Sequence, residues 1–156
     1  EIVEEYLGEP PVLLAERVWV RRHRAGRGLP WHQDAAFFGG EFRALNIWLA
    51  VTACGDDAPG LSVVARRFSR VQGLGDDEIP APLHYGLAFS AEDIRRFAGN
   101  YEVANPRFEP GDALLFDEMT LHRTSPVAWR VPYKDAAVTW FFAPSRFPPH
   151  RTPLAF

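Results

Sequence analysis

The sequence contains a single cysteine, Cys54, so no internal disulfide is possible and the chain suits a reducing compartment such as the cytoplasm. No apolar run reaches the ~18 residues that a membrane span needs, and no signal-peptide pattern opens the chain. An excess of basic residues is also missing, because the formal net charge is −3. General affinity for nucleic acid or anionic membranes is therefore not expected. An initiator methionine is absent at Glu1, which is compatible with missing N-terminal residues.

The composition is that of a globular protein, since 47% of the 156 residues are hydrophobic and 13% are aromatic. A chain of this length buries about 70% of its unfolded surface as one domain. Short strands are expected at residues 12–23, 45–52, 61–65, 101–103, 113–116, 121–123 and 136–142. Helices are expected at residues 1–7 and from Ser90, an N-cap, to about Gly99. We therefore expect one all-β-dominated domain over residues 1–156, a sandwich or barrel.

His32 and Asp34 stand two residues apart, and in an extended segment such positions project to the same side. His122 arrives from a distant expected strand and supplies a second imidazole. Two imidazoles and one carboxylate on one face of a metal form the facial triad typical of non-heme Fe(II) oxygenases. We therefore predict that these three residues bind a metal and are catalytic.

The other three histidines are not predicted to be metal ligands. His23 lies in an arginine-rich run, and His84 has no carboxylate at ligand spacing. His150 follows the last expected strand, among prolines.

The flanks of the motif resemble the phytanoyl-CoA dioxygenase-like family of Fe(II)/2-oxoglutarate-dependent oxygenases. The resemblance covers residues 17–145 and is carried by residues 31–53, 59–64, 111–116 and 121–126. It implies a double-stranded β-helix, that is, a cupin-like jelly roll, with a few short flanking helices. It also implies that His32, Asp34 and His122 hold ferrous iron.

The resemblance further implies an enzyme that uses dioxygen, converts 2-oxoglutarate to succinate and carbon dioxide, and hydroxylates a small molecule. Gln33 and Trp48 match family positions that line the 2-oxoglutarate pocket. Asp34 favours hydroxylation or desaturation, because related halogenases replace this carboxylate with a small residue so that chloride binds the iron. An apolar wall that keeps water from the oxidant is expected from Trp19, Phe37, Phe38, Trp48 and Phe116.

One departure from the family pattern concerns the group that holds the far carboxylate of 2-oxoglutarate. Relatives use an arginine about eleven residues after the second histidine, where the planar guanidinium pairs with the carboxylate. In this chain Tyr133 occupies that offset. Lys134 is the favoured anchor, acting as a point charge, and Arg130 is the reserve. The alternative for Lys134 is an exposed lysine in a turn.

A basic run in the first expected strand permits two interpretations. Its members are Arg17, Arg21, Arg22, Arg24 and Arg27, and Arg66, Arg67 and Arg70 add to them. One interpretation is a phosphate- or carboxylate-binding surface. We favour the other, in which these are solvated, outward-facing charges that protect an edge strand from pairing with other chains.

Three functions are compatible with the sequence. The favoured one is a cytoplasmic Fe(II)/2-oxoglutarate-dependent dioxygenase whose partners are dioxygen and a small-molecule substrate, with no nucleic acid or membrane. The second is a cupin-like metal isomerase or hydrolase that uses the same triad without 2-oxoglutarate. The third is a non-catalytic jelly-roll binding protein, which the absent arginine keeps open.

Overall fold

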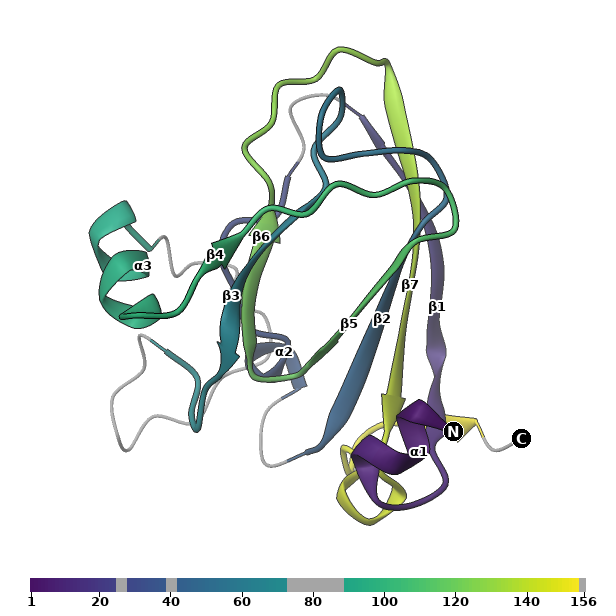
Figure 1. The fold of residues 1–156 in the computed structure, drawn as a ribbon. Coiled ribbons are helices and arrows are strands. Elements are labelled where there is room, and N and C mark those ends of the chain that lie inside the picture. Colours follow the sequence, from purple (N-terminus) through teal and green to yellow (C-terminus); the bar gives the residue numbers. More distant parts are fainter. Residues whose placement is uncertain (25–27, 39–41, 73–88, 155–156) are drawn as a thin grey trace.

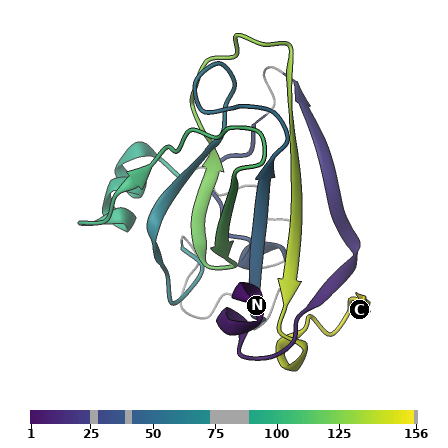
Figure 2. The same ribbon diagram turned by 45° about the vertical axis from the view of Figure 1, so that its right-hand side comes forward.

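The computed structural model describes residues 1–24, 28–38, 42–72 and 89–154. Two antiparallel β-sheets face each other, with short helices at the periphery (Figures 1 and 2). The all-β-dominated jelly roll expected from the sequence is confirmed, and so are the helices at the N-terminus and after Ser90. None of the helices in the described ranges is long and apolar enough to span a membrane.

The elements follow the sequence expectation closely, with longer strands at several places. The strands are β1 (Val12–Arg24), β2 (Ala44–Ala50), β3 (Leu61–Arg67), β4 (Val103–Ala104), β5 (Ala113–Asp117), β6 (Thr120–Thr124), β7 (Tyr133–Phe142) and β8 (Pro153–Leu154). The helices are α1 (Ile2–Leu7), α2 (Ala35–Phe38), α3 (Ala91–Ala98) and the 3-10 helix η1 (Pro144–Arg146). The sequence did not predict α2, η1 or β8, because elements of two to four residues leave no periodic pattern.

The five-stranded sheet has the order β5-β2-β7-β1-β8, so β7 lies in its middle. Along β7 every second residue is buried: Lys134, Ala136, Val138, Trp140 and Phe142. This alternation is the two-residue period of a strand with one face on the core. The register sets His23 of β1 opposite Lys134, and Trp48 of β2 opposite Val138. The buried face of this sheet therefore forms one wall, here called the floor, of the space between the two sheets.

The three-stranded sheet has the order β4-β3-β6, and α3 lies on its outer side (Figure 1). A capping box begins the helix: the Ser90 hydroxyl accepts a hydrogen bond from the Asp93 amide, and the Asp93 carboxylate accepts one from the Ser90 amide. Ile94 and Ala98 of α3 share one buried cluster with Val64 of β3. The helix thus covers the outer face of the three-stranded sheet, and the other face is turned toward the five-stranded sheet.

A polar network fastens helix α1 to the turn between β5 and β6. Tyr6 of α1 donates a hydrogen bond to the Asp117 carboxylate at 2.8 Å, and Arg67 forms ion pairs with Asp117 at 2.6 Å and Glu118 at 2.8 Å. Burial and the adjacent Asp117 raise the pKa of Tyr6 to about 12, so the hydroxyl stays a donor. The Glu118 carbonyl accepts a hydrogen bond from the Ala35 amide at 2.9 Å. The network therefore holds the backbone that directly follows Asp34.

Candidate metal centre

A pair of backbone hydrogen bonds sets His32 and His122 side by side. The His32 amide donates to the His122 carbonyl and the His122 amide donates to the His32 carbonyl, both at 2.9 Å. His122 lies on β6, so this antiparallel bridge adds the segment around His32 to the three-stranded sheet. The two imidazole rings end with their centroids 4.2 Å apart. Residues far apart in sequence are thereby brought together by the sheet itself.

Each imidazole is oriented by a backbone carbonyl. The Nδ1 atom of His32 lies 2.7 Å from the Pro30 carbonyl oxygen, and that of His122 lies 2.9 Å from the Thr120 carbonyl oxygen. A carbonyl only accepts, so each Nδ1 must carry the proton. The Nε2 lone pairs are therefore available, and this arrangement is the usual one for histidine ligands of metals.

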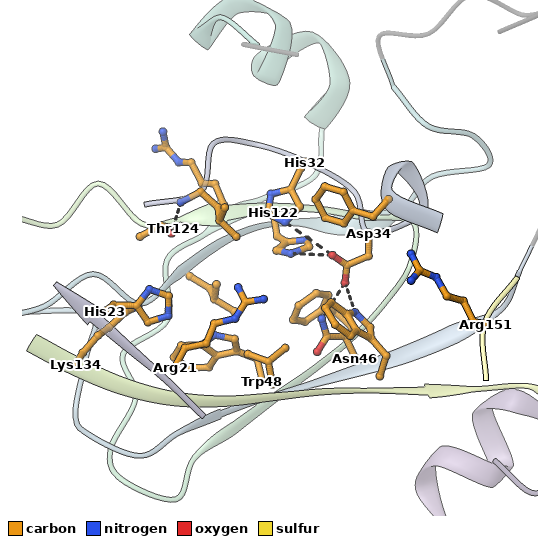
Figure 3. Close-up of a pocket in the computed structure, with 17 residues that line it drawn as sticks. Arg21, His23, His32, Asp34, Asn46, Trp48, His122, Thr124, Lys134 and Arg151 are labelled. Carbon is orange, nitrogen blue, oxygen red and sulfur yellow. Dashed lines mark hydrogen bonds and ion pairs between the residues drawn. The ribbon is translucent and has the colours of Figure 1, made fainter. Parts of the chain in front are cut away.

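The Asp34 carboxylate is equally well defined, with the residue only 1% exposed. Its Oδ2 atom accepts hydrogen bonds from Asn46 Nδ2 at 2.8 Å and from Trp140 Nε1 at 2.6 Å. Its Oδ1 atom lies 3.8 Å from the Nε2 atoms of both His32 and His122. One oxygen is thus occupied by the protein, and the other faces the two imidazoles (Figure 3).

The three ligand atoms fit a divalent metal. They lie within 4.8 Å of one another, and they combine two imidazole nitrogens with one carboxylate oxygen. Burial, and then the neighbouring His122, lower the pKa of His32 to about 4, although Asp34 opposes the shift. His32 is therefore neutral near pH 7, as a ligand must be. The structure brings together the three residues predicted from the sequence.

The three side chains open onto a cavity of about 230 Å³ between the two sheets (Figure 3). Phe37, Trp48 and Phe116 line it, as expected for the apolar wall. The side chains of Trp19 and Phe38 lie outside the part of the chain that the structure describes. Further apolar lining comes from Leu29, Leu61, Val138 and Trp140. The cavity is therefore lined mainly by apolar side chains. Its polar groups are mostly those of the metal centre and of a few cationic side chains.

Lys134 belongs to this cavity and is not the exposed turn lysine of the alternative interpretation. It is 2% exposed, because it is on the buried face of β7. Its ammonium donates to the Pro59 carbonyl and lies 5.3 Å from the centroid of the Trp48 ring. Burial lowers the pKa of Lys134 below its ordinary value. The predicted anchor thus extends along the cavity floor, over a residue that lines the pocket.

Two other residues predicted to contact 2-oxoglutarate are not among those that line the cavity. Arg130 has a side chain 75% exposed, and its guanidinium lies 3.6 Å from Asp57. The Gln33 amide donates to the Met119 carbonyl at 2.7 Å and accepts from the Gln72 amide at 2.6 Å. Gln33 follows the strand-like alternation between His32 and Asp34, so its side chain projects away from the metal centre. The amide group of Gln33 therefore forms hydrogen bonds with backbone groups.

The sequence interpretation missed several residues of the cavity whose side chains carry polar groups or charges, and these are Arg21, His23, Asn46, Arg123 and Arg151. The expectation of solvated charges on the first strand is wrong for Arg21, because it lines the cavity. It holds for Arg22, which is exposed and pairs with Asp135 at 2.8 Å. A two-residue period along this strand would have assigned Arg21 and His23 to one face and Arg22 to the other.

His23 lies at the same end of the cavity as Lys134 (Figure 3). Burial lowers the pKa of His23 to about 4, and the charges of Lys134 and Arg21 add to the effect. His23 is therefore neutral near pH 7. Of the other histidines set aside as ligands, His150 is exposed, and residue 84 is outside the described ranges.

Comparisons with known proteins point to one family and to several similar folds. The family model for phytanoyl-CoA dioxygenase (PhyH) matches residues 1–128. Among curated proteins no significant match is found. Solved structures provide similar folds at low sequence identity.

Three of these structures are representative. EctD from S. alaskensis, solved with 2-oxoglutarate and 5-hydroxyectoine, has 18% identity and a TM-score of 0.62, covering 92% of this chain and 48% of its own. AviO1 from Streptomyces viridochromogenes Tue57 has 17% identity and a TM-score of 0.60, covering 93% of this chain and 57% of its own. EvdO2 from Micromonospora carbonacea var. aurantiaca, complexed with 2-oxoglutarate, has 18% identity and a TM-score of 0.50, covering 99% and 60%. The chain thus spans about half the length of the structures it resembles.

Proposed function

Because the chain belongs to the phytanoyl-CoA dioxygenase family, we propose that it is an Fe(II)- and 2-oxoglutarate-dependent oxygenase that hydroxylates a small molecule. The observation that carries the proposal is the convergence of His32 Nε2, His122 Nε2 and Asp34 Oδ1, with every other polar atom of these side chains already bonded to the protein. Two imidazoles and one carboxylate are the donor set of non-heme ferrous sites.

The protein residues would hold and orient the iron. His32 and His122 would bind it through Nε2, and Asp34 through Oδ1. Asn46 and Trp140 would keep the second carboxylate oxygen turned away, so the carboxylate would bind through one atom only. Ferrous iron, when bound, supplies the activation of dioxygen that accompanies decarboxylation of 2-oxoglutarate to succinate.

Lys134 is the residue that we assign to the far carboxylate of 2-oxoglutarate. Its ammonium is buried, lies over Trp48 and keeps donor hydrogens beyond the bond to Pro59. His23 stands opposite Lys134 in the strand register and would offer the carboxylate a second polar group. A lysine provides no planar fork, so this neighbouring imidazole would supply the orientation that a lone ammonium lacks.

The apolar lining would protect the reaction from water. Phe37 packs against His32 with ring centroids 5.2 Å apart, Phe116 packs against His122 with ring centroids 4.4 Å apart, and Trp48 lines the cavity further from the metal centre. The carboxylate at position 34 would leave no place on the iron for a halide. We therefore propose hydroxylation or desaturation of a C–H bond as the outcome, and not halogenation.

The test is anaerobic addition of Fe(II) and then 2-oxoglutarate to the purified protein. A weak visible charge-transfer band is expected for the wild type, and none for His122→Ala. Admission of air should convert 2-oxoglutarate to succinate. Metal binding without a band and without succinate would contradict the proposal and favour an isomerase or hydrolase that uses the same triad alone.

A further inference from the structure

Cationic side chains are frequent among the described residues that line the cavity. Among the residues that the structure describes, its lining includes four cationic side chains, Arg21, Arg123, Lys134 and Arg151, and one carboxylate, that of Asp34. The complete chain, by contrast, has a formal net charge of −3. Ferrous iron and 2-oxoglutarate would cancel each other's charge. The proposed iron and 2-oxoglutarate sites use Asp34 and Lys134, and they assign no role to the arginines that line the cavity.

Arg21 and Arg151 are the two arginines directed at the metal centre. Figure 3 shows their guanidinium groups on two sides of the group formed by His32, Asp34 and His122, while His23 and Lys134 lie at the far end. Arg21 comes from the inward face of β1, and Arg151 precedes β8. Arg123 is different, since its guanidinium stacks on the Trp31 ring at 4.8 Å. Arg21 and Arg151 thus lie near the metal centre on two sides and come from separate elements.

The surroundings make these two guanidiniums effective for binding an anion. Apolar walls weaken solvent screening, and the planar donor fork of arginine matches the oxygens of a carboxylate or a phosphate. The charge of Arg21 contributes to the lowered pKa of His23, so the electrostatic field of Arg21 reaches the other end of the cavity. An anionic group held here would lie beside the metal centre and apart from Lys134.

We propose that the substrate is a small organic anion whose carboxylate or phosphate group is held by Arg21 and Arg151 next to the metal centre. This proposal rests on the proposed oxygenase function and names its substrate class. The same two arginines would fix the orientation of the substrate, and they would thereby select the C–H bond that faces the iron.

Calorimetric titration of the protein loaded with Ni(II) and N-oxalylglycine tests this proposal, because these replace iron and 2-oxoglutarate without turnover. The probes are butyrate, its neutral isostere butyramide, and inorganic phosphate. We expect butyrate or phosphate to bind at least about tenfold more tightly than butyramide. A preference for phosphate over butyrate would identify a phosphorylated substrate, and the reverse a carboxylic acid. Equal binding of butyrate and butyramide, or no binding of either anion, would overturn the proposal.

Variants distinguish the effect of the two cavity arginines on anion binding from a general effect of removing positive charge. Arg21→Met and Arg151→Met are each expected to weaken anion binding about tenfold, while N-oxalylglycine affinity stays within about twofold. Arg22→Met is the matched control, because it removes a neighbouring arginine that faces outward on the same strand. If both cavity variants bind anions as the wild type does, the assignment is wrong. Failure of N-oxalylglycine to bind, with anion binding intact in the Ni(II)-loaded protein, would instead contradict the oxygenase function alone.

Discussion

The two ends of the cavity hold their functional groups in different ways. At the metal end, backbone carbonyls orient both imidazoles, and Asn46 and Trp140 fix one oxygen of Asp34. At the other end, Lys134 reaches along the floor on a flexible four-carbon stem, with His23 opposite it. A metal needs donor atoms at set directions, whereas a carboxylate is attracted by a point charge over a range of positions. The different ways of holding these groups therefore follow from the ligand that each end would take.

The ends also differ in charge. Burial is the main cause of a pKa near 4 for both His32 and His23. At the metal end Asp34 opposes that shift, while at the far end Lys134 increases it. The cavity thus has one region suited to a cation and another suited to anions. A chelated 2-oxoglutarate, with carboxylates at both of its ends, would match this polarity.

The largest expected effect comes from removing a ligand at the metal end. His122→Ala should weaken Co(II) or Ni(II) binding by more than the ~100-fold that loss of an outer partner causes, because only two donors remain. Calorimetric metal titration measures this change. His150→Ala, which removes an exposed histidine, should bind metal like the wild type. Equal metal affinity in His122→Ala would place the metal elsewhere.

Loss of a supporting hydrogen bond at the same end should have a smaller effect. Asn46→Ala leaves the Asp34 Oδ2 atom with Trp140 as its remaining side-chain donor. Metal affinity should fall about 10- to 100-fold, since such outer partners orient the ligand. Asn100→Ala, at an exposed position, is the control. An Asn46→Ala variant with full affinity would show that rigidity at this end is unimportant.

At the far end, Lys134→Met should separate co-substrate binding from metal binding. Replacing the ammonium with a thioether of similar length should raise the dissociation constant of 2-oxoglutarate about tenfold or more, because a charge-assisted hydrogen bond is lost. Metal affinity should not change, and Lys134→Arg should restore part of the binding. Arg130→Ala should behave as wild type, given its exposure. If Arg130→Ala loses 2-oxoglutarate affinity and Lys134→Met does not, the anchor is Arg130 and not Lys134.

The smallest expected effect concerns protonation of His23. Its pKa is lowered from 6.5 to about 4 in the folded protein, so below pH 6.5 the unfolded chain binds a proton that the folded one resists. Protonation therefore stabilises the unfolded state, and the free energy of unfolding falls as the pH is lowered from about 6.5 toward 4. Urea unfolding of the metal-free protein should show that His23→Gln reduces the stability loss between pH 7 and 4.5 by about 1 kcal/mol, a value discounted for partial exposure. An unchanged loss would mean that His23 is not buried beside the cations.

Local pattern in the sequence was enough to predict most strands, helix α3 with its Ser90 cap, and the His32–Asp34 pair. It gave the wrong environment for Arg21 and left that of Lys134 open. On β2, Ile47 and Leu49 share one face while Asn46 and Trp48 share the other, and it is the polar-containing face that lines the cavity. A two-residue period determines which residues share a face, but the packing of the second sheet decides which face is buried.

The sequence by itself determined the donor set, because spacing of two in an extended segment aligns His32 with Asp34 and the flanks of His122 match the same family. Only the tertiary structure decided how the cavity is completed. In the folded protein the Gln33 side chain bonds to backbone groups and Arg130 is exposed to solvent. Lys134, Arg21 and Arg151 line the cavity. The physical reason is that a side chain's direction depends on local backbone geometry, whereas its surroundings depend on strands distant in the sequence.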